Sequence, residues 1–127
     1  MLRLRYGAIR MLFTGDIQHH TERWLLRHRP DLRADILQIP HHGSKTSTAA
    51  AFVRRVRPRV GIISLGAGNI YGHPHPSVLR VLESERVQVF RTDDHGAITV
   101  TSDGTRYDIT TFRPYRPPPP PARRPAR

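Results

Sequence analysis

Three side chains of this 127-residue chain have the types and positions expected of metal ligands. Asp16 follows an apolar run that ends at Gly15, and His41 and His42 follow a second apolar run that ends at Pro40. Carboxylate oxygen and imidazole nitrogen are common zinc ligands, and the combination also suits manganese. Because α/β proteins build active sites where strands end and loops begin, these positions predict part of a hydrolytic centre that holds a divalent metal, Zn²⁺ or Mn²⁺.

Each of these side chains also has a simpler interpretation. The carboxylate of Asp16 could bridge two cations with its two oxygens, or it could cap a helix or a turn. At most one of His41 and His42 is expected to point into the same space as Asp16, which leaves the other free to transfer a proton or contact a phosphate. The three residues together favour metal ligands over an ordinary turn, but their spacing does not choose between the two histidines.

Two neighbouring segments add polar groups to the same region. Gly43 and Ser44 are expected to leave backbone N–H groups free for an oxyanion or a phosphate, which makes Ser44 a candidate catalytic residue. The glycine-rich segment 65–75 permits close approach of the backbone to a ligand and contributes two more candidate catalytic residues, Asn69 and His73. His73 is expected to bind the substrate or transfer a proton.

The remaining polar positions are assigned structural roles or two interpretations. Tyr71 adds a polar group to the glycine-rich segment, and His75 is expected to cap the following helix or to be solvated. Segment 91–96 either supplies a polar edge of the same cleft or forms a turn. Three further histidines are predicted at the surface (His19, His20 and His28). The sequence contains no P-loop, dinucleotide-binding glycine fingerprint or nucleophile elbow.

Hydrophobic periodicity and turn residues predict the elements that position these side chains. The predicted strands are 1–7, 9–14, 36–39, 60–64, 87–90, 96–101 and 106–111, and the predicted helices are 22–28, 49–56 and 76–85. Thr21 is expected to cap the first helix and Ser47 or Thr48 the second, while Pro76 begins the third. This order predicts an α/β fold in which a mixed sheet is flanked by helices and ends in an antiparallel hairpin.

The composition separates a folded body from a basic tail. Seven of the twelve prolines lie from residue 114 onward, so 113–127 is predicted to be a disordered Pro/Arg-rich tail and 1–112 the domain. The net charge is +11 for the whole chain and +6 for residues 1–112, which contain 16 basic and 10 acidic residues. A basic body suits a polyanion such as DNA, with a generally solvated arginine surface as the equal alternative. The absence of cysteine excludes thiolate metal sites, and without a long apolar run the chain alone is expected to be soluble.

Five segments resemble the metallo-β-lactamase-like domain of the ComEC family, bacterial competence proteins that carry transforming DNA through the inner membrane. These segments are Leu12–Asp16, Pro40–Ser47, Ser64–Gly66, Asn69–Pro74 and Arg91–Ile98. The resemblance covers nearly all of residues 1–112 in order and spacing, and it leaves out the proline-rich tail.

The resemblance implies an αβ/βα sandwich with a two-metal site, of which this chain would be the C-terminal half. Asp16 would be the bridging aspartate, and His41 or His42 would be the last histidine ligand. The N-terminal metal-binding half with its His-x-His-x-Asp-His motif is absent from the sequence, as are the membrane-channel segments. The chain is therefore expected to derive from a longer inner-membrane protein with this domain outside the cytoplasm.

The implied function is that of a phosphodiesterase or nuclease-type hydrolase for DNA uptake in natural transformation, with His73 near the phosphate. The expected partners are single-stranded DNA, bound through its phosphate backbone, and the missing N-terminal half or membrane channel of the parent protein. Because a catalytic zinc usually has three protein ligands, the chain alone is expected to be weakly active or inactive. The alternatives are a non-catalytic nucleic-acid-binding or assembly module, and a stand-alone small-molecule hydrolase of the same fold, such as a lactonase.

Overall fold

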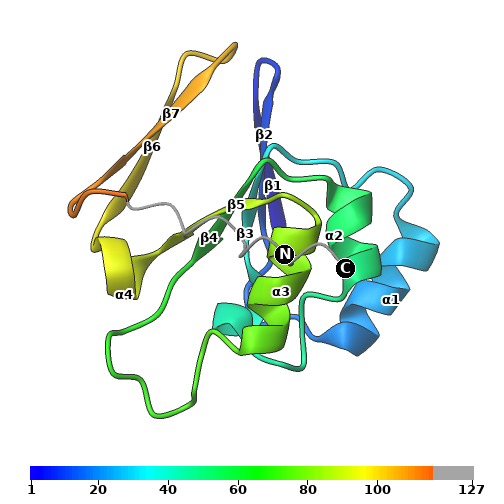
Figure 1. Cartoon of the computed structure of the whole chain (residues 1–127). Coiled ribbons are helices and arrows are strands. Elements are labelled where there is room, and N and C mark those ends of the chain that lie inside the picture. Colours follow the sequence, from blue (N-terminus) through cyan, green and yellow to red (C-terminus); the bar gives the residue numbers. More distant parts are fainter. Residues whose placement is uncertain (116–127) are drawn as a thin grey trace, which may run out of the picture.

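Strands and helices alternate along residues 1–115, which are the residues that the computed structural model describes (Figure 1). The strands are β1 (Leu2–Tyr6), β2 (Ile9–Phe13), β3 (Ile36–Gln38), β4 (Val60–Ile63), β5 (Gln88–Arg91), β6 (Ile98–Ser102) and β7 (Tyr107–Thr111). The helices are α1 (His19–His28), α2 (Ala50–Val56), α3 (Pro76–Ser84) and α4 (Thr92–His95), with a 3₁₀ turn η1 (Pro40–Gly43). The predicted strands and the three predicted helices are confirmed to within a few residues, and η1 and α4 fall in segments predicted as loops or turns.

The main sheet is mixed, as predicted, with the strand order β1-β2-β3-β4-β5. β1 and β2 form an antiparallel hairpin in which Leu4 lies opposite Met11. The strands from β2 to β5 are parallel to one another, and α1, α2 and α3 provide the crossovers between them. β6 and β7 form a separate antiparallel pair, joined at the predicted turn.

Side chains alternate between the two faces of the main sheet, because successive residues of a strand point to opposite sides. The face that packs on α1, α2 and α3 includes Leu12, Leu37 and Ile63. The face that packs on the β6–β7 hairpin includes Ile36, Val60 and Phe90. The helices accordingly lie on one side of the sheet and the hairpin on the other (Figure 1).

The helices bury the apolar stripes that the sequence predicted. In α2, Phe52, Val53 and Val56 are buried, and in α3 Val78 and Leu82 are buried. The spacing of these residues places them on one side of each helix, facing the sheet. The proline predicted to begin the third helix occupies the first turn of α3, where its fixed φ angle suits the helix.

The predicted caps of the first two helices are wrong. Thr21 lies inside α1, which begins two residues before it. The N-cap position of α2 is Ala49, rather than Ser47 or Thr48, and no side chain at that position caps the helix. Instead, the buried carboxylate of Glu22 on α1 accepts hydrogen bonds from the backbone N–H groups of Thr48 and Ala49. A tertiary contact thus supplies the acceptor that was expected from the local sequence.

Residues 113–115, which the sequence assigns to the tail, contact the body of the protein. The N–H of Arg113 donates to the carbonyl of His95, and the ring of Tyr115 lies 4.8 Å from that of Phe90. The remainder of the predicted disordered tail, 116–127, lies outside the described residues. No helix within residues 1–115 has the length and apolar character needed to cross a membrane.

Candidate metal centre

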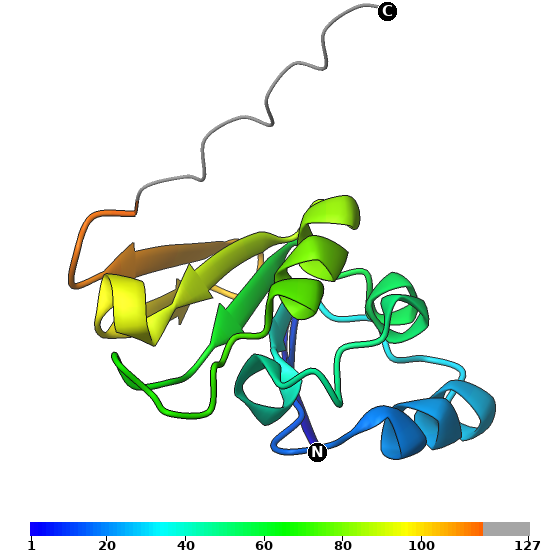
Figure 2. The ribbon, with the colours of Figure 1, turned by 60° about the horizontal axis from the view of Figure 1, so that its bottom comes forward.

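The candidate residues lie at the carboxyl ends of the four parallel strands. Asp16 follows β2, His41 and His42 follow β3, the loop 64–75 follows β4, and α4 follows β5. Parallel strands bring these ends to one edge of the sheet, so segments far apart in the sequence converge. In Figure 2 the loop after β4, in green, runs beside η1, and the N–H of His75 at the end of that loop donates to the carbonyl of Gly43 in η1.

Gln38 at the end of β3 fixes the backbone that carries Asp16. Its Oε1 atom accepts hydrogen bonds from the N–H groups of Thr14 (3.0 Å) and Gly15 (2.9 Å). The buried hydroxyl of Thr14 donates to the carbonyl of Gln38 at 2.7 Å. Gly15 has a φ of +59°, which glycine adopts without strain, and this turn places Asp16 at the edge of the sheet.

The two histidines occupy strained backbone. His41 and His42 have φ angles of +50° and +54°, a region that residues with a side chain rarely adopt and that is found at functional sites. The N–H of His41 donates to the carbonyl of Gly15 at 3.0 Å, and the N–H of Ser44 donates to the carbonyl of His41 at 2.8 Å. The first of these bonds ties η1 directly to the loop that carries Asp16.

His42 is the histidine that faces Asp16. Its Nε2 atom lies 3.7 Å from Oδ1 of Asp16, and its Nδ1 atom lies 2.6 Å from the carbonyl oxygen of Ser64. Because a carbonyl only accepts, Nδ1 must carry the proton, which leaves the lone pair of Nε2 available to a metal. Both side chains are exposed, so further ligands have access. The geometry therefore favours His42 rather than His41 as the metal ligand, whereas the sequence did not distinguish between them.

His41 turns instead towards His73. The two rings have centroids 6.1 Å apart, and Nδ1 of His41 lies 3.4 Å from the hydroxyl of Thr46. Nδ1 of His73 is buried and has no hydrogen-bond partner among the described residues. Burial lowers the pKa of His73, and the charges of the neighbouring histidines, His41 first, lower it further. The neutral ring of His73 is therefore favoured.

Gly43 allows η1 to pack closely on the loop that carries His73. Its φ is +78°, and a Cβ at this position would lie 2.7 Å from the Cβ and 3.2 Å from the Cα of Pro74. The N–H of His75 also donates to the carbonyl of Gly43 at 2.8 Å. A side chain at position 43 would therefore displace Pro74 and, with it, His73.

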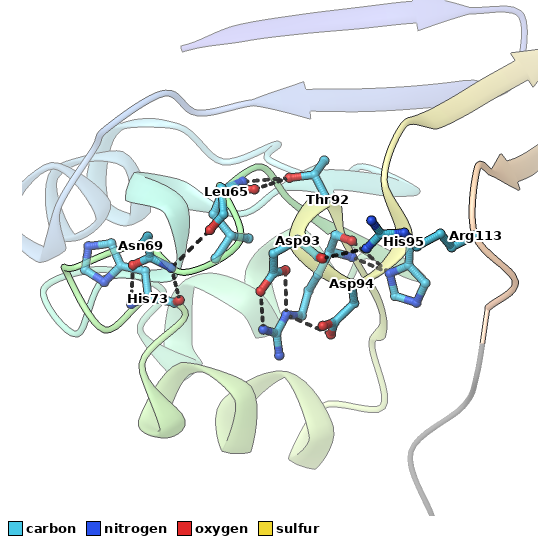
Figure 3. A network of polar contacts seen from close by, with 10 residues as sticks. Leu65, Asn69, His73, Thr92, Asp93, Asp94, His95 and Arg113 are labelled. Carbon is cyan, nitrogen blue, oxygen red and sulfur yellow. Dashed lines mark hydrogen bonds and ion pairs between the residues drawn. The ribbon is translucent and has the colours of Figure 1, made fainter.

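Two pairs of hydrogen bonds hold the loop 64–75 in place (Figure 3). The side chain of Asn69 accepts from the N–H of His73 at 3.0 Å and donates to the carbonyl of His73 at 2.8 Å. The hydroxyl of Thr92 accepts from the N–H of Leu65 at 2.8 Å and donates to its carbonyl at 2.7 Å. Asn69 therefore positions His73, while Thr92 ties the start of the loop to α4.

Segment 91–96 contains a short helical turn, α4, that is stabilised by ion pairs within the segment (Figure 3). Nε of Arg91 lies 3.1 Å from Oδ1 of Asp93 and 3.3 Å from Oδ2 of Asp94. The hydrogen bonds to Asp93 raise the pKa of Arg91 above its already high ordinary value. These carboxylates are thus balanced by a permanent positive charge on their own segment.

Asp16 and His42 fit part of a metal site. Within residues 1–115, no group of three or more His, Cys, Asp or Glu side chains is arranged to hold a metal ion. The pair offers a carboxylate oxygen and a ring nitrogen whose tautomer is fixed, which suits Zn²⁺ or Mn²⁺. A catalytic zinc usually takes three protein ligands and a water, so the pair accounts for two positions.

Three known proteins are similar to most of the chain. ComE operon protein 3 of Bacillus subtilis is 34% identical over 115 residues, which cover 91% of this chain and 15% of that protein. Recombination protein 2 of Haemophilus influenzae is 36% identical over 113 residues, and competence protein ComA of Neisseria gonorrhoeae is 32% identical over 99 residues. These cover 86% and 77% of this chain, and 14% of each relative.

The chain belongs to the ComEC family of competence proteins. It spans 14–15% of the length of these curated relatives. No family model matches this ComEC-family chain, and no solved structure matches it at a significant level. The mixed α/β architecture is observed directly, while the metallo-β-lactamase-like sandwich stays a prediction.

The environment of Ser44 differs from the expectation for this ComEC-family chain. Its N–H donates to the carbonyl of His41, so this amide is not free for an anion, because the tight turn of η1 uses it. Its buried hydroxyl lies 3.1 Å from that of Thr46. A catalytic role for Ser44 stays a prediction.

The other histidines of this ComEC-family chain have structural contacts or lie at the surface. His75 caps α3, since its Nδ1 accepts a hydrogen bond from the N–H of Ser77 at 3.3 Å. Nδ1 of His19 lies 3.1 Å from the carboxylate of Glu22. Two histidines are exposed, as predicted (His20 and His28).

Sequence reasoning missed two residues that position the site, Gln38 and Thr92. Gln38 is the one polar residue in the apolar run 36–39, and an isolated polar residue in a buried strand is a signal that its side chain has a specific partner. Thr92 follows directly after β5, and its hydroxyl bonds the backbone of Leu65, which follows β4. A contact between the ends of two different strands leaves no local sequence pattern.

Proposed function

We propose that this chain is part of a metal-dependent phosphodiesterase that acts on DNA during its uptake in natural transformation. The supporting observation is the Asp16–His42 pair, 3.7 Å apart, in which Ser64 fixes the tautomer of the histidine. The half-buried ring of His73 lies 6.1 Å from that of His41, the residue before His42. The names of the relatives, a competence protein and a recombination protein, support DNA as the substrate class.

Each residue has a defined role in this proposal. Asp16 and His42 would hold one side of a Zn²⁺ or Mn²⁺ ion. When bound, such an ion supplies an activated water at neutral pH and polarises the phosphoryl oxygen. His73, whose ring is half-buried, would hydrogen-bond the phosphate or transfer a proton to the leaving group, and Asn69 keeps that residue in place. The net charge of +11 attracts a polyanion to the protein.

The remaining metal ligands would come from the rest of a longer protein. This chain corresponds to about one seventh of its relatives, which leaves room for a complementary half-domain and a membrane channel. We expect weak or no hydrolysis by the 127-residue chain alone, but measurable metal binding at the pair.

The test is to titrate the chain with Zn²⁺ and Mn²⁺ by calorimetry and to follow cleavage of labelled single-stranded DNA. Asp16→Asn and His42→Gln should each lower metal affinity about tenfold or more, equivalent to about 1.4 kcal/mol, because each removes one of two ligands. His41→Gln should have a smaller effect, since that ring points towards Thr46 and His73. His20→Ala is the matched control, an exposed histidine on α1.

Three outcomes would count against the proposal or its ligand assignment. If the unaltered chain binds neither metal, or if His20→Ala weakens binding as much as His42→Gln, the pair is not a metal site. If His41→Gln abolishes binding while His42→Gln does not, the ligand assignment is reversed.

A non-catalytic nucleic-acid-binding module is the second candidate. It is favoured by the finding that the part of the chain that the structure describes holds no third ligand near the pair. Such a module would bind single-stranded DNA with a steep salt dependence, and neither added Zn²⁺ nor a chelator would change its affinity.

A further inference from the structure

We propose that Tyr71 forms a base-stacking subsite next to the candidate metal centre, and that this subsite takes one unpaired nucleobase of a single-stranded nucleic acid. The inference rests on the proposed function for the phosphodiester and adds the part of the substrate that the loop 64–75 recognises. Four observations support it: the exposure of Tyr71, its stacking on His73, its place in an array of rings that ends at the metal ligands, and the open space around the loop.

Tyr71 presents an aromatic face to solvent. The residue is 76% exposed, which is high for a side chain with a large apolar ring. The ring stacks on that of His73, with centroids 6.0 Å apart and an angle of 26° between the planes. One face of Tyr71 is thus turned towards a residue of the candidate centre, and the other face is available to a ligand.

Tyr71 is the outer member of an array of rings that leads to the metal ligands. The centroid of His73 lies 6.1 Å from that of His41, which lies 6.5 Å from that of His42. The array ends at Nε2 of His42, 3.7 Å from Asp16. If a base stacks on Tyr71, the adjoining sugar–phosphate backbone would therefore run along the histidines towards Asp16.

The loop is fixed at its base and open at its tip. The hydrogen bonds of Asn69 and Thr92 fix its start and the position of His73, as described above (Figure 3). Gly68 and Gly72 flank the tip with φ angles of +69° and +67°, and a Cβ at either position would meet no atom within 4 Å. The backbone on both sides of Tyr71 is therefore exposed, while hydrogen bonds hold His73 on the inner side of the loop.

The chemistry of stacking points to an unpaired base. Every base has a π face, and stacking on an aromatic side chain contributes about 1–3 kcal/mol per base with little sequence preference. A base inside a duplex has both faces covered by its neighbours, so the subsite would favour single strands. A protein partner that docked on the same tip would instead depend on Ile70, which is 91% exposed and not aromatic.

The test is direct binding in the presence of a chelator, so that no hydrolysis occurs. Fluorescence anisotropy would compare a labelled oligothymidylate with an abasic oligomer of equal length, which carries the same phosphates without bases. Tyr71→Ala should weaken binding of the oligothymidylate about 5- to 150-fold, the range equivalent to stacking of one base, and should leave the abasic oligomer unchanged. Tyr71→Trp should retain the binding.

Two control variants each remove one feature that Tyr71→Ala also removes, either apolar surface at the tip of the loop or an exposed aromatic ring. Ile70→Ala removes apolar surface from the same tip. Trp24→Ala removes another exposed aromatic side chain stacked on a histidine, since the rings of Trp24 and His28 on α1 lie 4.6 Å apart. Both variants should bind the oligothymidylate like the unaltered chain.

The proposal is overturned if Tyr71→Ala weakens both oligomers equally, if it weakens neither, or if Ile70→Ala has an effect as large. It is also overturned if the unaltered chain binds neither oligomer. Calorimetric titration of the unaltered chain with Zn²⁺ or Mn²⁺, compared with His42→Gln, tests the proposed function separately. Failure to bind either metal counts against the metal-dependent phosphodiesterase and leaves the stacking measurement, which is made in the presence of a chelator, intact.

Discussion

His73 joins the candidate metal centre to the proposed base-stacking subsite. Its ring lies between those of Tyr71 and His41, and its Nδ1 atom is buried without a partner among the described residues. A buried polar atom without a partner costs free energy, of the order of 1–3 kcal/mol. A buried water that bridges Nδ1 to a neighbouring polar group would relieve that cost. The neutral ring is the form able to accept a proton.

The lowered pKa of His73 gives a pH-dependent prediction. In the unfolded chain this histidine has the ordinary pKa of about 6.5, so on acidification the unfolded state takes up the proton first. The stabilising contribution of the neutral ring should be present above about pH 6.5 and lost as the pH falls towards the lower folded pKa. An NMR titration of the ring should show a midpoint below 6.5, and His73→Asn should flatten the fall in unfolding free energy between pH 7 and 5. A midpoint at or above 6.5 would contradict this.

At the residue scale, the sequence predicted which side chains converge but not how they are oriented. Asp16 and the histidine pair could be placed together because both follow parallel strands. The choice of His42 over His41 depends on two positive φ angles and on a hydrogen bond to Ser64, which lies 22 residues away. Local sequence does not encode a contact of that range. The hydrogen bonds that Gln38 accepts from the N–H groups of Thr14 and Gly15 were missed for the same reason.

At the element scale, Glu22 connects α1 to the start of α2. It is fully buried on α1, and its carboxylate accepts hydrogen bonds from the N–H groups of Thr48 and Ala49 at the start of α2. Helix capping from sequence considers only residues next to the helix end, so a cap from 26 residues away could not be predicted. Strands and helix stripes were predicted because they depend on periodicity alone.

Glu22→Gln should lower the free energy of unfolding by about 1–3 kcal/mol. The amide keeps the shape of the side chain but replaces one acceptor with a donor, which leaves a buried backbone N–H unpaired. Urea denaturation followed by circular dichroism measures the change. Glu83→Gln is the matched control, because Glu83 is exposed on α3 and its replacement should have little effect. Equal stability of the Glu22 variant and the unaltered chain would show that the cap contributes nothing.

At the scale of the whole molecule, the two faces of the main sheet are covered unequally. The helices cover one face, while on the other face the β6–β7 hairpin covers β3, β4 and β5 better than β1. Leu2 (65%), Leu4 (49%) and Phe13 (38%) remain exposed, and the register of β1 and β2 places them on the same face. The alternate residue Arg3 points to the other side, where it pairs with Asp31 at 3.0 Å. β1 is thus an edge strand with an apolar open face.

An edge strand with exposed apolar side chains should make the chain associate as its concentration rises. Replacing Leu2 and Leu4 with lysine should raise the concentration at which association begins about tenfold or more, because a charge on an edge strand opposes pairing with another chain. The unfolding free energy should change by no more than about 0.5 kcal/mol, since both side chains are exposed. Sedimentation velocity over a concentration series measures the effect, with Ile70→Lys as the control for an exposed apolar residue on a loop. If the unaltered chain stays monomeric throughout, the open face does not drive association. If Ile70→Lys acts as strongly as the double variant, charge alone rather than the apolar face of β1 controls it.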